Sequence, residues 1–262
     1  MRSAYSGWMA LVLLSVLISG CSGNQRSSND DQDATSAEPE RASASAIDPE
    51  TVGEVTGQIV FNGQAPPRTR LRMQSVPACV QANAKPTYSE DVIVNNNNTL
   101  RNVFVYVKKG LGNKIFPASA APPVLDQRGC VYSPHVLGVI AGQTLRIKNS
   151  DPANHNVHSF SKINREWNQS MPPNGADLLE HFARPEVMIE LKCNVHPWMK
   201  AYVGVTTNPF FAVSDETGSF TIKGLPPGTY KIAAWHERYG TQDQQISLAP
   251  KESIKMNFAF KQ

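Results

Sequence analysis

The stretch Lys192-Cys193-Asn194-Val195-His196-Pro197-Trp198-Met199-Lys200 places a thiol, an imidazole and a thioether within seven residues. It lies between two β-branched runs, 187–192 and 202–206, which predicts a loop joining two strands. A second stretch, Asn149-Ser150-Asp151-Pro152-Ala153-Asn154-His155-Asn156-Val157-His158, follows the predicted strand 144–148. Together the two stretches supply the nitrogen and sulfur donors of a metal site.

The donor types favour copper over other metals. Two imidazoles and a thiolate in one plane, with a long axial thioether, form the blue-copper arrangement. A binuclear copper centre needs two bridging thiolates, and this loop has only Cys193. Multicopper oxidases need several His-x-His pairs, and the sequence has none. A structural zinc site would rarely use methionine.

The spacing Asn-x5-His-Asn, combined with Cys-x2-His-Pro-aromatic-Met, resembles the cupredoxins, and most of all amicyanin and its relatives. The resemblance covers residues 123–207 and implies a Greek-key β-sandwich. It further implies one copper ion bound by four residues: His155, Cys193, His196 and, as the axial ligand, Met199. In the same family the ring edge of the second histidine reaches solvent, so we expect this of His196.

Two neighbours of His155 have separate expectations. The resemblance implies that Asn156 braces the ligand loop near Asn194. His158 lies three residues beyond His155, so on a strand it points to the opposite face. We therefore expect His158 to lie outside the ligand set.

From Thr51 onward the chain predicts an all-β fold. Short alternating or β-branched runs are separated by turn signals such as Asn62-Gly63 and Thr217-Gly218, a spacing that favours β-sandwiches. Only residues 77–84 read as a short helix. The predicted strands are 54–61, 103–107, 144–148, 187–192, 202–206, 219–222, 229–235 and 255–260.

The carboxy-terminal stretch 211–232 (FAVSDETGSFTIKGLPPGTYKI) resembles the carboxypeptidase regulatory-like, or transthyretin-like, domain. That family opens with a strand such as 57–63 (GQIVFNG), which lies far upstream here. We therefore expect residues 51–122 and 208–262 to form one sandwich with the cupredoxin unit, 123–207, inserted between them. Two sequential domains are the alternative.

The amino terminus reads as a bacterial lipoprotein signal. Residues 1–21 combine Arg2, an eleven-residue apolar run and small residues before Cys21, and that run is too short to span a bilayer. Leu17-Ile18-Ser19-Gly20-Cys21 resembles the lipobox, which implies lipidation of Cys21 and a protein held at a membrane by lipid. We expect the periplasmic face of a bacterial membrane, and Ser22 favours the outer one.

Charge is unevenly distributed along the 262 residues. The formal net charge is +3, but residues 22–50 carry −5 and residues 51–262 carry +7. Residues 22–50 contain no aromatic residue and a single β-branched aliphatic, Ile47, which predicts a disordered acidic tether. No basic run is long enough to indicate nucleic-acid binding.

Four cysteines exclude a disulfide-dense scaffold. With Cys21 and Cys193 assigned, Cys79 and Cys130 of a secreted chain predict one disulfide. Two buried free thiols are the alternative.

The leading hypothesis is therefore a membrane-anchored copper protein that transfers single electrons to a transient protein partner. One alternative is a glycan- or protein-binding surface module with structural copper, and another is copper storage or delivery. We do not expect an enzyme, because no acid–base pair or nucleophile motif is identifiable.

Overall fold

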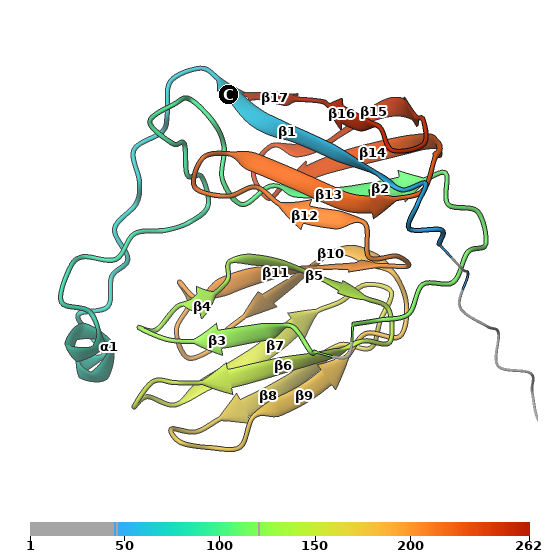
Figure 1. Ribbon diagram of the computed structural model, residues 1–262. Coiled ribbons are helices and arrows are strands. Elements are labelled where there is room, and N and C mark those ends of the chain that lie inside the picture. Colours follow the sequence, from blue (N-terminus) through green and yellow to red (C-terminus); the bar gives the residue numbers. More distant parts are fainter. Residues whose placement is uncertain (1–44, 46, 120) are drawn as a thin grey trace, which may run out of the picture. The chain divides into compact units, whose positions relative to one another are not determined.

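The computed structural model describes residue 45, residues 47–119 and residues 121–262 (Figure 1). The predicted signal peptide 1–21, the lipidation site Cys21 and most of the predicted tether 22–50 lie outside these residues. Within the described part of the chain no helix is long and apolar enough to cross a membrane. The predicted all-β fold class is confirmed: seventeen strands and one short helix, α1 (Pro77–Ala82), are present there.

The first sandwich joins the start and the end of the described chain. Strand β1 (Gly53–Asn62) pairs antiparallel with β13 (Ser219–Leu225), with Val55 opposite Ile222. It pairs in parallel with β16 (Ser253–Lys255) and β17 (Phe258–Lys261). The second sheet of this sandwich has the order β12-β2-β14-β15, with bounds Phe211–Val213, Phe104–Lys109, Gly228–His236 and Gly240–Leu248.

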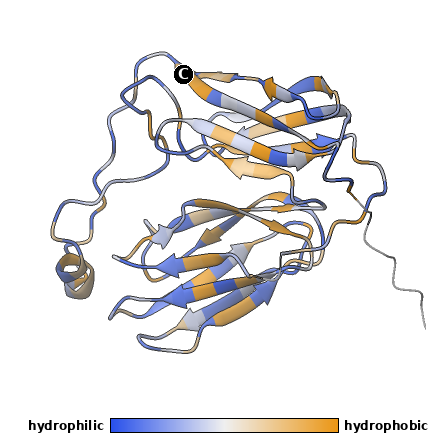
Figure 2. Cartoon of the chain, viewed as in Figure 1, coloured by the Kyte–Doolittle hydropathy of each residue, from blue (hydrophilic) through white to orange (hydrophobic). Residues whose placement is uncertain are grey.

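The core of this sandwich follows from strand alternation. Alternate residues of β1, among them Val55, Ile59 and Phe61, are buried. They pack with Ile232 of β14 and Phe258 of β17 in one apolar cluster. Figure 2 shows the same alternation of hydrophobic and hydrophilic residues along the strands. The period of two thus assigns one face of each strand to the core.

The predicted strand 255–260 is divided in two. Both parts, β16 and β17, pair with β1, but Asn257 lies between them and its side-chain Oδ1 accepts a hydrogen bond from the backbone N–H of Gln58 at 2.9 Å. A side chain thus replaces one rung of the backbone ladder, which explains why the strand is interrupted there.

The second sandwich is formed by the middle of the chain. One sheet has the order β5-β11-β10-β7-β8, with bounds Val136–Ile140, Lys200–Thr206, Glu186–Lys192, His155–Phe160 and Trp167–Met171. The other has the order β4-β3-β6-β9, with bounds Tyr132–Ser133, Val124–Gln127, Thr144–Asn149 and Leu178–His181. Parallel pairs (β5 with β11, β3 with β6) show that the chain crosses between the sheets.

Two glycines allow the sandwiches to pack closely on each other. A Cβ on Gly138 of β5 would lie 2.3 Å from the Phe211 ring, and one on Gly204 of β11 would lie 2.5 Å from the Phe104 ring. Phe104 and Phe211 belong to the first sandwich, and their ring centroids lie 5.5 Å apart. Because these two glycines have no side chains, the rings of Phe104 and Phe211 fit between the facing sheets of the two sandwiches.

Two segments differ from their sequence-based assignment. Ser45 and Ile115 exchange hydrogen bonds through the Ser45 N–H and Oγ, and Ile47 packs against the first core, so the predicted tether is attached to the body at this end. Ile47 is the one apolar β-branched residue of that tether, and its packing against the first core holds this end of the tether on the body. Met73 and Cys79, which the sequence placed with the first sandwich, are buried in the second core instead.

Candidate metal centre

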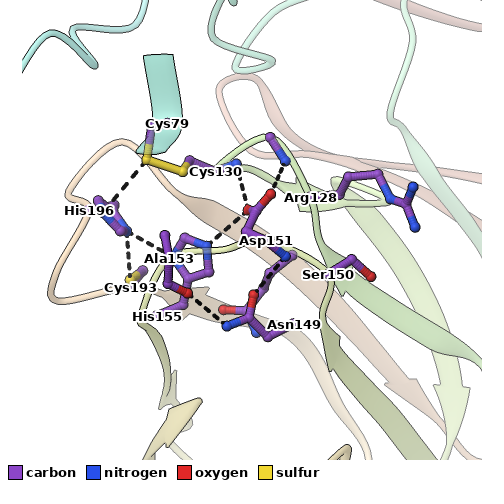
Figure 3. Close-up of polar contacts among 12 residues, drawn as sticks. Cys79, Arg128, Cys130, Asn149, Ser150, Asp151, Ala153, His155, Cys193 and His196 are labelled. Atoms are coloured by element: carbon purple, nitrogen blue, oxygen red, sulfur yellow. Dashed lines mark hydrogen bonds and ion pairs between the residues drawn. A yellow bond between two sulfur atoms is a disulfide. The ribbon is translucent and has the colours of Figure 1, made fainter. Parts of the chain in front are cut away.

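The structure brings together three of the four predicted copper ligands as a compact cluster. His155 begins β7, while Cys193 and His196 lie in the loop that joins β10 to β11. The donor atoms of these three residues lie within 4.8 Å of one another. Exposure of the side chains is slight, with His155 at 0%, and Cys193 and His196 each at 2%. Figure 3 shows the three side chains pointing toward one another.

The two imidazoles face each other through the same ring atom. Nδ1 of His155 lies 2.8 Å from Nδ1 of His196, and the Sγ of Cys193 lies 3.8 Å from Nδ1 of His196. Two nitrogens and a sulfur thus converge on one small volume. Nitrogen and thiolate donors of this kind fit copper, so the residues present fit the group that the sequence implies.

Met199, the predicted axial ligand, is buried at the end of the same loop. The Cys193 N–H donates to the Met199 carbonyl at 3.2 Å, and the Met199 N–H donates to the His196 carbonyl at 2.9 Å. These two bonds close the loop on itself. Met199 and Cys193 belong to the same buried cluster.

Asn156 connects β7 to the ligand loop. Its side-chain oxygen accepts hydrogen bonds from the backbone N–H groups of Asn194 at 2.7 Å and Val195 at 3.3 Å, and from the Cys193 thiol at 3.4 Å. Its carbonyl accepts from the Tyr132 hydroxyl at 2.7 Å. Asn156 therefore fixes the loop relative to the strand that carries His155.

Asp151 holds the outer nitrogen of His155. Its Oδ2 lies 2.9 Å from Nε2 of His155, and the carboxylate also accepts backbone N–H bonds from Gly129 at 2.6 Å and Cys130 at 2.8 Å (Figure 3). A carboxylate on the outer nitrogen places the proton there and leaves Nδ1 free as a donor to metal. Burial by itself would raise the pKa of Asp151, but the hydrogen bonds from His155, Cys130 and Gly129 outweigh it and lower the pKa.

The electrostatics favour metal-binding protonation states at Cys193 and His196, whereas at His155 burial by itself would lower the pKa but the hydrogen bonds to Asp151 and Cys193 raise it overall. Burial by itself would raise the pKa of the Cys193 thiol, but hydrogen bonds from His155 and from the backbone of Asn156 and His196 lower it overall. A lowered pKa favours the thiolate, which is the form that binds metals. Burial, together with the nearby His155, lowers the pKa of His196 and so favours its neutral form.

The predicted disulfide is confirmed, and it lies against this site. Cys79 of α1 and Cys130 are bonded, with their Cα atoms 5.5 Å apart. Sγ of Cys79 lies 3.8 Å from Nε2 of His196. The expectation that the ring edge of His196 reaches solvent is wrong, because the segment joined by this disulfide covers that edge.

The other histidines lie outside the cluster. His158 contacts Glu166 at 2.6 Å and Asn194 at 3.3 Å. His181 is exposed, and His236 is buried and accepts a backbone N–H bond from Arg238. Each therefore has a role other than completing the three-donor cluster.

His135 joins a second polar group between the two sandwiches. It contacts Glu237, the residue after β14, and Glu237 also contacts Lys200 and the Tyr202 hydroxyl. Lys200 follows Met199 directly in the chain and contacts Asp91 at 2.9 Å as well. An ion-pair network thus lies one residue from the predicted ligand loop.

Sequence reasoning missed Asp151 and Glu237 as parts of this region, and it missed the contact of Cys79 with His196. Asp151 had a usable signal, an acidic residue four positions before His155 in a turn-forming stretch. The contact of Cys79 with His196 joins residues 117 positions apart, and that of Glu237 with His135 spans 102 positions. No local pattern encodes such distant pairs.

Comparison with known proteins bears on both sandwiches. Residues 197–261 match the family model of the carboxypeptidase regulatory-like domain, as the sequence resemblance predicted. No curated protein matches the chain.

Among solved structures, a copper-containing nitrite reductase from Thermus scotoductus SA-01 is similar at 20% identity and a TM-score of 0.31. The match covers 36% of this chain and only 24% of the reductase. A purple cupredoxin from Nitrosopumilus maritimus is similar at 21% identity and a TM-score of 0.28, over 32% of this chain and 99% of that one. The oxidised state of an amicyanin mutant has 24% identity and a TM-score of 0.29, over 33% of this chain and 84% of that one. Cupredoxins, the family that the ligand motif resembles, are thus among the similar structures.

Proposed function

We propose that the second sandwich holds one copper ion between Nδ1 of His155, Sγ of Cys193 and Nδ1 of His196, with the thioether of Met199 as a weaker fourth ligand. The observation that carries this proposal is the convergence of three buried donors whose Nδ1 atoms face each other at 2.8 Å. At this distance one Nδ1–H can donate to the other Nδ1, and loss of that single proton leaves two imidazole nitrogens and the Cys193 sulfur directed at one point.

We further propose that the protein carries single electrons and does not turn over a substrate. When bound in such a set, copper can be reduced and oxidised in place, since thiolate and thioether favour Cu(I) and imidazole suits both states. The chain keeps the donors fixed in both states: Asp151 orients His155, and Asn156 holds the Cys193 loop. Little movement of the protein then accompanies each electron.

Burial of the donors supports a retained ion over rapid exchange. Each donor residue is nearly inaccessible to solvent, which hinders a chelator or a delivery partner from reaching the metal. Fast loss of Cu(I) to a chelator would support storage or delivery in place of electron transfer.

The proposal includes attachment to a membrane on its periplasmic face through lipid on Cys21. Its support is the lipobox-like sequence 17–21. Mass spectrometry of the amino-terminal peptide tests it, with Cys21→Ser as the variant that should release the protein from membranes.

The test of the copper site is reconstitution of the full chain followed by optical and electron paramagnetic resonance spectra. We expect an intense visible thiolate-to-Cu(II) band with one copper per chain, and its loss in Cys193→Ser. His158→Ala is the matched control, since His158 lies on the same strand outside the donor cluster, and it should keep the band. A band that survives Cys193→Ser contradicts the proposal.

A further inference from the structure

A stretch between β1 and β2 covers the outer side of the donor cluster. This cover segment, residues 71–83, includes α1 and packs on the second core: Met73 and Cys79 are buried there, and Leu71, Val76 and Ala78 pack against it. It belongs to neither sheet of that sandwich. Its attachment must therefore come from side chains, and the Cys79–Cys130 disulfide is its covalent link.

One sulfur of this disulfide, Sγ of Cys79, contacts the imidazole of His196. Sγ of Cys79 is 3.8 Å from Nε2 of His196, while Nδ1 of the same ring faces His155 (Figure 3). Both nitrogens of His196 are thus enclosed by protein. The indole Nε1 of Trp198, two residues further along the loop, donates to the Cys130 carbonyl at 2.9 Å and ties the loop to the same bridge.

The other cysteine of the disulfide, Cys130, is connected to the imidazole of His155 through Asp151. The backbone N–H groups of Gly129 and Cys130 both donate to the Asp151 carboxylate, and Asp151 in turn holds Nε2 of His155. The turn that carries Cys130 therefore positions the carboxylate that orients His155. The disulfide therefore contacts His196 directly and supports His155 through the Asp151 carboxylate.

We propose that the Cys79–Cys130 disulfide is a latch on the metal centre: it holds the cover segment over His196 and, through Asp151, positions His155. This inference rests on the proposed copper site. Both cysteines of the bridge are fully buried, so the bond is shielded from reductants in solution. Asp151 and the disulfide act as positioning groups, since neither contributes a donor to the proposed ligand set.

The latch has a consequence for metal retention. With the bridge removed, the cover can lift, and Nε2 of His196 becomes accessible to water and to small ligands. Disturbing groups that orient metal ligands typically lowers metal affinity or activity by roughly 10–100-fold. The side chain of Asn83 donates to the carbonyls of Cys79 and Gly129 at 2.8 Å each, so without the bridge we expect the cover to open and reclose on this contact and not to detach.

The first experiment measures transfer of Cu(I) from the loaded full chain to excess bathocuproine disulfonate. We expect the Cys79→Ser/Cys130→Ser variant to lose copper roughly 10–100-fold faster than the natural chain. Asp151→Asn should weaken retention and shift the thiolate band while the cover stays in place. Glu166→Gln is the matched control, a carboxylate on a histidine outside the cluster, and should change neither. Equal release rates for the natural chain and the double variant would overturn the latch.

A second experiment needs no copper and separates the two proposals. Diethyl pyrocarbonate modifies accessible histidines, and peptide mass spectrometry locates the modified residues. In the metal-free natural chain we expect His181, which is exposed, to react quickly and His196 to be protected. In the double serine variant His196 should become reactive. Rapid modification of His196 in the natural chain would overturn the latch, whereas a protected His196 in a chain that binds no copper would overturn only the proposed function.

Discussion

The two sandwiches are made from similar strands but bury different chemistry. In the first, the buried Ser214 bonds to the backbone alone: its Oγ donates to the Leu100 carbonyl and accepts the Val103 N–H. In the second, the buried polar side chains around His155 bond to one another. Backbone-directed bonds complete a fold, whereas side chains directed at each other in a core create a site. Both sandwiches have an apolar core, and the three-donor cluster lies in the second.

The largest effects are expected from substitutions that create a cavity in each core, and they test whether the copper site depends on the second core alone. Phe258 of β17 is fully buried in the first core, and Phe258→Ala should lower the unfolding free energy by about 3–5 kcal/mol. The folded fraction should still give an unchanged copper spectrum. Leu191→Ala, two residues before Cys193 in the second core, should lower stability by roughly 2–5 kcal/mol and alter the spectrum as well.

Denaturant titration and copper spectra on the same samples check this pair. An altered copper spectrum for folded Phe258→Ala would show that the site also depends on the core of the first sandwich.

The disulfide closes a loop that includes β2 of the first sandwich, so it should stabilise the whole body while it holds the cover segment locally. It joins residues 51 apart, and the loop-entropy relation gives about 4 kcal/mol for a loop of this size. In Cys79→Ser/Cys130→Ser we expect the unfolding free energy to fall by that amount. Hydrogen exchange should show protection lost in residues 71–83 and retained in β1. Equal loss of protection in β1 would mean that the bridge has no local hold on residues 71–83.

A smaller effect is expected from the ion pairs that join the sandwiches. Burial by itself would raise the pKa of Glu237, but bonds from His135 and Lys200 lower it below its ordinary value of 4.5. A lowered pKa in the folded state gives stability above the unfolded pKa, and that stability is lost as the pH falls through the folded pKa. Glu237→Gln should therefore cost about 2 kcal/mol at neutral pH.

Unfolding measured from pH 7 downward checks the sign of this effect. The difference between the natural chain and Glu237→Gln should shrink as the pH falls below about 4.5. A difference that is constant across this range would show that the carboxylate charge is not what joins the sandwiches.

Local patterns predicted much of this molecule. The turns at Thr217-Gly218 and Pro226-Pro227-Gly228 mark the β12–β13 and β13–β14 connections, because glycine and proline favour turn conformations at those points. The helix expected at 77–84 is present at Pro77–Ala82. The disulfide followed from cysteine arithmetic, and the His155, Cys193 and His196 cluster followed from two short motifs.

Features that depend on distant residues could not be predicted. The covered edge of His196 depends on where the segment 71–83 packs, and apolar residues such as Met73 and Val76 fit either core by composition alone. The role of Asp151 depends on two backbone N–H groups more than 20 residues upstream. The boundaries of the cupredoxin unit, 123–207, and of the discontinuous sandwich, 51–122 and 208–262, stay predictions.

The proposed copper site uses one sulfur and two imidazoles of the second sandwich. X-ray absorption at the copper edge of the loaded full chain tests it most directly, because sulfur and nitrogen neighbours scatter differently. We expect one short copper–sulfur distance and two imidazole nitrogens, with the sulfur lost in Cys193→Ser. A shell of nitrogen and oxygen only, or one unchanged in Cys193→Ser, would contradict it.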